Sequence, residues 1–444
     1  MRPKADLSMP NAYVPGIGNL SEQDEAMIER RARVLGPAYR LMYETPLHLV
    51  RGEGVWLYDE DGRAYLDAYN NVASLGHCHP RVVEAIREQV GILATNTRYI
   101  HGLIVDYAER LVATFPAELS QVMFACTGSE ANDLAMRIAR AYTGGTGIIV
   151  TENAYHGISE AVACFSPSLG ASVDLGVHVR TVPAPDAYRA GGSDVCETFT
   201  ANVEAAIADL KRHGIKPAAL IVDTLFTSDG VLPGPKGFLA GAVDAIHEAG
   251  GIFVADEVQP GFGRTGEAMW GFHRHGVVPD LVTLGKPMGN GHPVSAVVMR
   301  PEVCDEFGRK ARYFNTFGGN AVSCAAAMAV LQTIEEDGLM ANSATVGRYL
   351  LDGIRRISEG HDCVGDIRGA GLFIGADIVT DRSSRAPDRE RASRIVNRMR
   401  DLGVLISVTG KFHNALKIRP PLVFTKANAD RFIEVMEEAL ETRT

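Results

Sequence analysis

The chain has 444 residues, of which 46% are hydrophobic and 22% charged, as in a soluble globular protein with a large core. Its net charge of −10 does not favour a nucleic acid or an acidic membrane surface as a partner. Seven cysteines without a Cys-x-x-Cys pair argue against a disulfide scaffold or a zinc ribbon. Because there is neither a secretory signal nor an apolar run of ~18 residues, we expect a cytoplasmic protein without a membrane partner.

The first part of the chain predicts a helix and a hairpin. Ser21 is a candidate N-cap for a helix over residues 22–35, which is acidic at its start and basic toward its end. Residues 55–66 read as a β-hairpin with an Asp-Gly turn. We assign residues 1–70 to an N-terminal segment that belongs to a small domain.

A polar loop over residues 70–80 precedes a helix near residues 81–93. Asn71 and Val72 in this loop are candidates to line a substrate entrance. The run of His77, Cys78 and His79 has no second ligand cluster nearby, and on a strand Cys78 would face away from the two histidines. We therefore expect no metal site in this chain.

Strands and helices then alternate, which predicts an α/β fold with a mostly parallel sheet covered by helices. The predicted strands are 121–126, 148–150, 218–223, 252–256, 281–286 and 294–299, and the predicted helices between them are 127–141, 201–213 and 240–248. A long Ala-rich helix ends near Glu336, and a helix, strands and a last helix follow. We predict a large domain over residues 71–325 and a C-terminal small α+β domain over 326–444.

Two of these buried strands end in opposite charges, Asp256 and Lys286. A buried charge needs a partner, and ligands bind at the carboxyl ends of strands in open α/β sheets. A structural ion pair would satisfy both residues. So would pyridoxal 5'-phosphate, to which a lysine binds as a Schiff base while an aspartate holds the ring nitrogen protonated.

Three further segments offer groups for such a cofactor. Gly128 and Ser129 open a helix, whose N-terminus is a natural phosphate seat, although an ordinary capped helix has the same pattern. Tyr155 follows a strand and could stack on a flat ring. Thr316 precedes two glycines and could donate a hydroxyl to a phosphate or only cap its loop.

Charged residues near the other strand ends remain open to two interpretations. Asp223 ends a buried strand. Arg419 lies in an apolar setting, where it could bind a substrate carboxylate or phosphate, or form an inter-subunit salt bridge. The segment 369–375 does not fit the spacing of a dinucleotide-binding loop, and we read it as one strand at which backbones pack closely.

Together these motifs closely resemble the class III pyridoxal phosphate-dependent aminotransferases. The resemblance runs in order from about Tyr43 to Glu438 and rests on residues 127–131, 155–157, 256–266, 285–286 and 316–320. A finer resemblance, at residues 70–80, 96–99, 285–293 and 416–421, is to a branch with ethanolamine-phosphate phospho-lyases and alanine–glyoxylate-type aminotransferases.

The resemblance implies fold type I and a homodimer with a shared active site. It implies roles for cofactor-site residues: Lys286 as Schiff-base lysine, Asp256 at the pyridinium nitrogen, Gln259 near the ring hydroxyl, Val258 and Tyr155 on the ring faces, Gly128 and Ser129 at the phosphate, and Thr316 at the partner's phosphate. His156 is placed beside the cofactor without an acid–base role. Asp223 departs from the family, which usually has Glu there, and a shorter acid reaches less far.

Three functions remain open from the sequence. The first is transamination from a primary amine or amino acid to a keto acid such as pyruvate, with Lys286 as base. The second is elimination of phosphate and ammonia from ethanolamine phosphate or a similar amine, with Arg419, Lys411 and His413 as candidate phosphate-binding cations. The third is a non-catalytic cofactor binder, which the presence of both Lys286 and Asp256 disfavours. We favour transamination.

Overall fold

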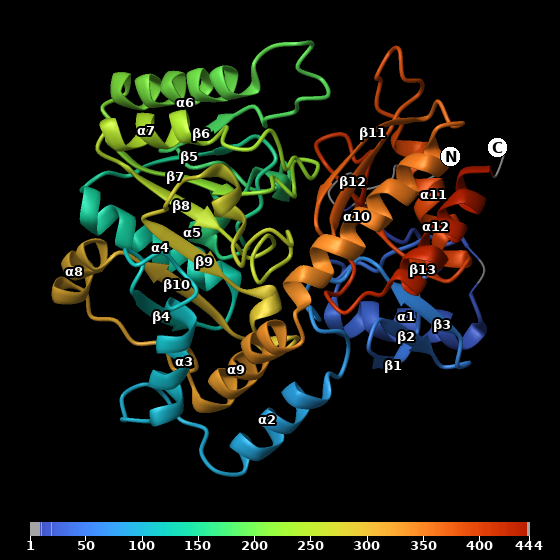
Figure 1. The fold of residues 1–444 in the computed structure, drawn as a ribbon, viewed down its shortest axis with the longest axis horizontal. Helices are drawn as coiled ribbons and strands as arrows, with labels where there is room; N and C mark the ends of the chain where they lie inside the picture. The colour runs from blue at the N-terminus through green and yellow to red at the C-terminus, as the bar shows by residue number, and fades with distance from the viewer. Residues whose placement is uncertain (1–8, 10, 19, 442–444) are drawn as a thin grey trace.

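A seven-stranded sheet forms the centre of the larger part of the molecule (Figure 1). The computed structural model describes residues 9, 11–18 and 20–441. In spatial order the strands are β4 (Gln121–Ala125), β10 (Ser295–Met299), β9 (Leu281–Leu284), β8 (Ile252–Asp256), β7 (Pro217–Asp223), β5 (Gly147–Thr151) and β6 (Val179–Val182). The pairs from β9 to β6 are parallel, as the alternation predicted.

Alternate residues of the central strands face two different cores. On β7, Leu220 and Val222 pack into one hydrophobic cluster, whereas Ala219 and Ile221 pack into another. Helices therefore cover both faces, which explains why these strands read as continuous apolar runs. On one side lie α6 (Val195–Arg212), α7 (Ala240–Glu248), α9 (Ala321–Glu336) and α3 (Gly102–Val112); on the other lie α4 (Gly128–Thr143), α5 (Glu160–Ala163) and α8 (Pro301–Lys310).

The smaller part of the molecule joins the two ends of the chain (Figure 1). One sheet has the order β1 (Leu49–Glu53), β2 (Trp56–Asp59), β3 (Ala64–Asp67) and β13 (Val404–Leu405); the other has β11 (Val364–Ala370), β12 (Phe373–Ile378), β15 (Ala415–Ile418) and β14 (Ser407–Thr409). Parallel pairing of β3 with β13 places the predicted N-terminal hairpin beside the C-terminal strands. The domain boundaries at residues 70 and 325 stay a prediction.

Further helices lie in both parts of the molecule. These are α1 (Glu22–Leu35), α2 (Pro80–Val90), α10 (Leu339–Ser358), α11 (Arg389–Asp401) and α12 (Lys426–Glu441), with short 3₁₀ turns η1 (Pro167–Leu169), η2 (Gly271–His275) and η3 (Lys286–Gly289). Ser21 caps α1 as predicted, because its hydroxyl accepts a hydrogen bond from the Asp24 N–H. All seven cysteines are unpaired. Within the described ranges no helix combines the length and apolarity needed to cross a bilayer.

The mostly parallel sheet is confirmed with one exception, and the reading of residues 369–375 needs correction. The strand β10 runs antiparallel to both β9 and β4, so the sheet is mixed. Only ten residues separate β9 from β10, too few for the crossover that a parallel pair requires. The segment 369–375 is not one strand: it contains the turn between β11 and β12, at Gly371, whose φ is +54°. The close backbone packing there is as expected, since a Cβ on Gly371 would lie 2.5 Å from the Arg264 carbonyl oxygen.

Candidate active site

The ends of three neighbouring parallel strands bring the predicted acids and the lysine to one edge of the sheet. Asp223 at the end of β7 is in register with Asp256 at the end of β8, and Asp256 with Thr283 on β9, three residues before Lys286. A cavity of about 160 Å³ opens there. Its lining residues are Gly128, Ser129, Asn132, Tyr155, His156, Gly157, Asp223, Asp256, Val258, Gln259 and Lys286.

Asp256 is 4% exposed, and three donors hold its carboxylate. Asn132 Nδ2 donates to Oδ2 at 3.0 Å, the Val258 N–H donates to Oδ1 at 3.1 Å, and His156 Nδ1 lies 2.7 Å from Oδ2. Asn132 also donates to the His156 carbonyl at 2.7 Å, so one side chain fixes both partners. Such donors offset the cost of burying a carboxylate and fix its direction.

Lys286 lines the same cavity and is half-buried. Its Nζ lies 5.9 Å from the centroid of the Tyr155 ring. Burial, followed by the positive charge of Arg419, lowers the pKa of the Lys286 amine below its usual value. A larger fraction of this amine is therefore uncharged, and the uncharged amine is the nucleophile and the proton acceptor.

Glycines let the backbone close tightly around one end of the cavity. A Cβ on Gly128 or on Gly285 would meet Val258 Cγ1 at 3.3 Å, and a Cβ on Gly157 would meet Ser129 Oγ at 2.5 Å. The Thr127 capping box starts α4 here, so the N–H groups of Gly128 and Ser129 face no helical carbonyl. This end of the cavity is suited to an anion such as a phosphate.

Two cations lie directly behind Gln259. Lys417 Nζ donates to Gln259 Oε1 at 3.1 Å, and Arg419 Nη1 donates to the same oxygen. Arg419 also donates to the Tyr69 carbonyl at 3.1 and 2.9 Å. Burial, aided by the neighbouring Arg419, holds the pKa of the Lys417 amine well below its usual value.

Asp223 does not reach these cations. It accepts hydrogen bonds from Thr227 Oγ1 and from the Leu225 N–H at 3.0 Å, both on its own loop, and it lies 3.5 Å from Gln259 Nε2. Burial and the nearby Asp256 raise the pKa of Asp223. The expectation that a short acid has limited reach agrees with this geometry.

Some sequence-based candidates lie outside the cavity lining. Arg419 and buried Asn71 do not line the cavity, but both bind the lining residue Gln259. Arg419 donates to the Gln259 side-chain oxygen, and Asn71 donates to the Gln259 carbonyl at 3.1 Å. Val72 and Thr316 are exposed. Of the cations proposed for phosphate elimination, Lys411 pairs with Glu152 at 2.7 Å and His413 lines a different cavity.

Sequence reasoning missed Asn132, Gly157 and Lys417. Asn132 lies one helical turn beyond Gly128 and so faces the same side of α4, which a helical projection could have indicated. Lys417 lies on β15 and Arg419 directly follows this strand, so the two side chains, two residues apart, point to the same side. No local signal showed that this face meets Gln259.

Comparison with known proteins agrees with the geometry. The family model for class III aminotransferases matches residues 40–440. The chain belongs to the class III aminotransferase family. Members of this family are pyridoxal phosphate-dependent enzymes, so the third possibility, a cofactor binder without catalysis, stays disfavoured.

Some relatives of this class III enzyme are named as aminotransferases and others as phospho-lyases, the two activities that the sequence left open. It is 42% identical to the alanine–glyoxylate aminotransferase 2-like protein of Drosophila melanogaster, over 93% of this chain and 86% of that one. It is 36% identical to ethanolamine-phosphate phospho-lyase homolog 1 of Caenorhabditis elegans, over 94% and 93%.

Solved structures of the family share the fold. A phospholyase from Arthrobacter in complex with phosphoethanolamine has a TM-score of 0.91 at 42% identity, covering 94% of this chain and 100% of that one. A Bacillus anthracis aminotransferase has a TM-score of 0.86 at 26% identity, covering 96% and 100%. These similarities establish the mostly parallel α/β fold of type I.

Replacing Asn132 tests how the Asp256 carboxylate is held. Asn132→Ala removes one hydrogen bond to a charged group, worth about 1.5 kcal/mol, so we expect turnover to fall about tenfold. Asn132→Asp is nearly isosteric but places a second carboxylate against Asp256, so the loss should be larger. Turnover and cofactor affinity are measured together at pH 7. Wild-type values in Asn132→Asp would contradict this role of Asn132.

Proposed function

We propose that this enzyme binds pyridoxal 5'-phosphate in the cavity beside Lys286. The observation that carries the proposal is that one cavity holds both a carboxylate fixed by three donors, Asp256, and an amine of lowered pKa, Lys286. The close approach of Gly128 and Gly285 to Val258 supports a flat ring against Val258, with Tyr155 on its other face. The start of α4 supports a phosphate seat at Gly128 and Ser129.

The bound cofactor would supply a covalent carbonyl and an electron sink for the carbon that carries the substrate nitrogen. The residues of this chain would supply the acid and the base. Asp256 would hold the proton on the ring nitrogen, and His156 and Asn132 orient Asp256. The uncharged Lys286 amine would take the proton from the substrate carbon and, in transamination, deliver it to the carbonyl carbon of the cofactor.

We propose transamination between an amine or amino acid that carries an anionic group and a keto acid such as pyruvate. Support comes from Lys417 and Arg419, two buried basic side chains that donate to one neutral amide oxygen. An anion bound there would favour the charged form of the Lys417 amine, whose pKa burial lowers. A carboxylate accepts hydrogen bonds from cations more strongly than an amide does. A substrate anion would therefore displace Gln259 Oε1 and bind both side chains.

The second candidate is elimination of phosphate from a phosphorylated amine such as ethanolamine phosphate. The same cation pair favours it, because a phosphate dianion would use both Lys417 and Arg419. The likeness to the Arthrobacter phospholyase also supports it. In this reaction Lys286 would again remove the proton, but the phosphate would leave before the proton returns.

Reaction products distinguish the two candidates. With an amino acid donor and pyruvate we expect alanine and the donor's keto acid. With ethanolamine phosphate and no keto acid we expect no inorganic phosphate, because transamination stops after one turnover without an acceptor. Catalytic release of phosphate would overturn the transaminase proposal in favour of the lyase. Lys286→Ala is the control, and it should abolish either reaction while the circular dichroism spectrum stays unchanged.

Lys417→Met tests the proposed anion contact. The variant keeps most of the side-chain volume and removes the charge, so KM for a carboxylate-bearing donor should rise about tenfold or more, as for a lost hydrogen bond to a charged group. KM for an uncharged amine donor should stay near the wild-type value. Equal changes for both donors would show that Lys417 supports the fold rather than the substrate.

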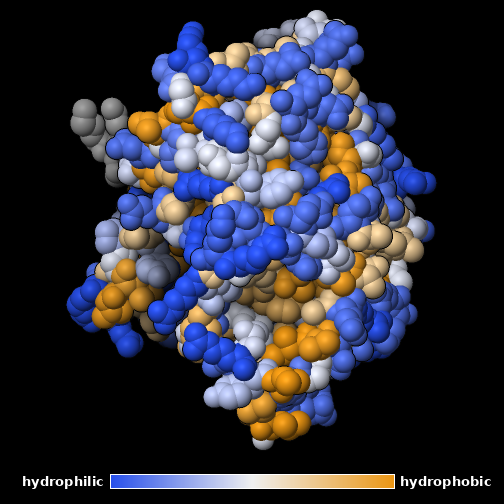
Figure 2. Space-filling model, turned by 90° about the vertical axis from the view of Figure 1, so that its left-hand side faces the viewer, coloured by the Kyte–Doolittle hydropathy of each residue, from blue (hydrophilic) through white to orange (hydrophobic). Residues whose placement is uncertain are grey.

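We further propose a homodimer with a shared active site. Large apolar side chains are exposed in the segments between α2 and α3 and before α9: Ile92, Tyr99, Ile100, Phe314 and Phe317. Figure 2 shows apolar surface gathered in the lower half of the face that it presents, where Figure 1 places α2 and the start of α3. Exposed Thr316 lies beside Phe317 on such a surface, which supports its prediction as a phosphate ligand for the partner.

Mixing two inactive variants tests the shared site. Thr316→Glu would repel the phosphate, and Lys286→Ala removes the base. If Thr316 serves the partner, a mixed dimer has one intact site, so co-expression of the two variants should restore turnover. If Thr316 serves its own subunit, or the enzyme is a monomer, no intact site forms and turnover stays absent.

We also propose that the enzyme works in the cytoplasm. Seven unpaired cysteines support a reducing compartment. Two relatives, from Arabidopsis thaliana and Homo sapiens, are named as mitochondrial proteins, so a fluorescent fusion that localises to mitochondria would contradict this proposal.

A further inference from the structure

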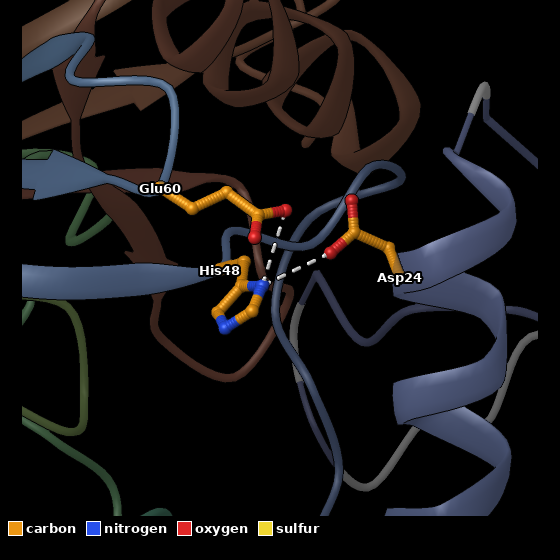
Figure 3. Close-up of side chains that lie close together, drawn as sticks. All are labelled: Asp24, His48 and Glu60. Atoms are coloured by element: carbon orange, nitrogen blue, oxygen red, sulfur yellow. Dashed lines mark ion pairs between the residues drawn. The ribbon is translucent and has the colours of Figure 1, made fainter.

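A histidine and two carboxylates converge outside the active site, where α1 meets the hairpin of β1 and β2 (Figure 3). His48 directly precedes β1, Glu60 directly follows β2, and Asp24 lies in the first turn of α1. The strand register pairs Leu49 with Asp59, so His48 and Glu60 sit side by side at the open end of the hairpin. One ligand atom from each of the three side chains lies within 4.8 Å of the others.

Outer hydrogen bonds orient both carboxylates toward the histidine. Ser21 Oγ donates to Asp24 Oδ2 at 2.9 Å, and Gln23 Nε2 donates to Glu60 Oε2 at 2.8 Å. The other oxygen of each carboxylate, Asp24 Oδ1 and Glu60 Oε1, faces His48 Nδ1. Partners that fix one oxygen and leave the second free are typical of the outer shell of metal sites.

The distances fit a metal better than a hydrogen-bonded ion pair. His48 Nδ1 lies 3.4 Å from Asp24 Oδ1 and 3.3 Å from Glu60 Oε1, whereas charge-assisted hydrogen bonds are about 2.7–2.9 Å long. With zinc–ligand bonds of about 2.0–2.2 Å, neighbouring ligand atoms of a tetrahedron lie about 3.3–3.6 Å apart. Nδ1 is shielded from solvent and forms no hydrogen bond within the part of the chain that the structure describes.

We propose that Asp24, His48 and Glu60 bind a zinc ion, a site separate from the proposed catalytic function. The three side chains are 26–31% exposed, so the ion can enter from solvent and a water molecule can complete its coordination. The helix α1 buries none of its residues. The ion would therefore hold α1 against the hairpin, a contact that apolar packing supports only weakly.

Calorimetric titration of the cofactor-loaded enzyme with zinc sulfate, after dialysis against EDTA, tests the site. We expect one zinc ion per chain in the wild type and no binding at this site in His48→Ala or in the nearly isosteric Asp24→Asn. Gln23→Ala removes only the outer hydrogen bond to Glu60, so its affinity should fall about tenfold. Zinc should also slow proteolysis of α1 in the wild type and not in His48→Ala.

A matched control is His213→Ala. His213 Nδ1 also lies 3.4 Å from a carboxylate, that of Asp209, but within the described residues no third ligand joins this pair. Its zinc binding should equal that of the wild type. The proposal is overturned if the wild type binds no zinc at millimolar concentration, or if His48→Ala binds it with unchanged affinity; the three side chains are then only an ion-pair cluster.

Discussion

The active site depends on keeping one buried carboxylate in place. A carboxylate taken out of water is costly unless donors surround it, and Asp256 is only 4% exposed. His156, Asn132 and the Val258 N–H supply these donors from three different segments. Because these groups leave the carboxylate little freedom, a ring nitrogen that binds there meets an acid of fixed direction.

The sheet topology brings the remaining chemistry to that carboxylate. Parallel strands end at the same edge, so residues that close β7, β8 and β9 become neighbours although they are far apart in sequence. The helix α4 starts at the same edge and supplies backbone N–H groups. One arrangement of strands therefore places the Asp256 carboxylate, the Lys286 amine and the N–H groups at the start of α4 around the same cavity.

The basic side chains next to the cavity favour a substrate that carries an anionic group. Lys417 and Arg419 come from β15 and the residue that follows it, in the smaller part of the molecule, and meet Gln259 from the larger part. Asp223 forms hydrogen bonds within its own loop, and in the described part of the chain neither Lys417 nor Arg419 forms an ion pair with a carboxylate. Whether Lys417 and Arg419 bind a carboxylate or a phosphate therefore distinguishes transamination from phosphate elimination.

The sequence by itself determined the alternation of strands and helices, the helix caps and the charged ends of the strands, because periodicity and capping are local properties. It also indicated the family, since the motifs around Lys286 and Asp256 lie in a fixed order. Only the tertiary structure decided that β10 is antiparallel, that Lys417 reaches Gln259, and that Asp24, His48 and Glu60 converge. These contacts join segments distant in the chain, and side-chain convergence of that kind leaves no pattern in neighbouring residues.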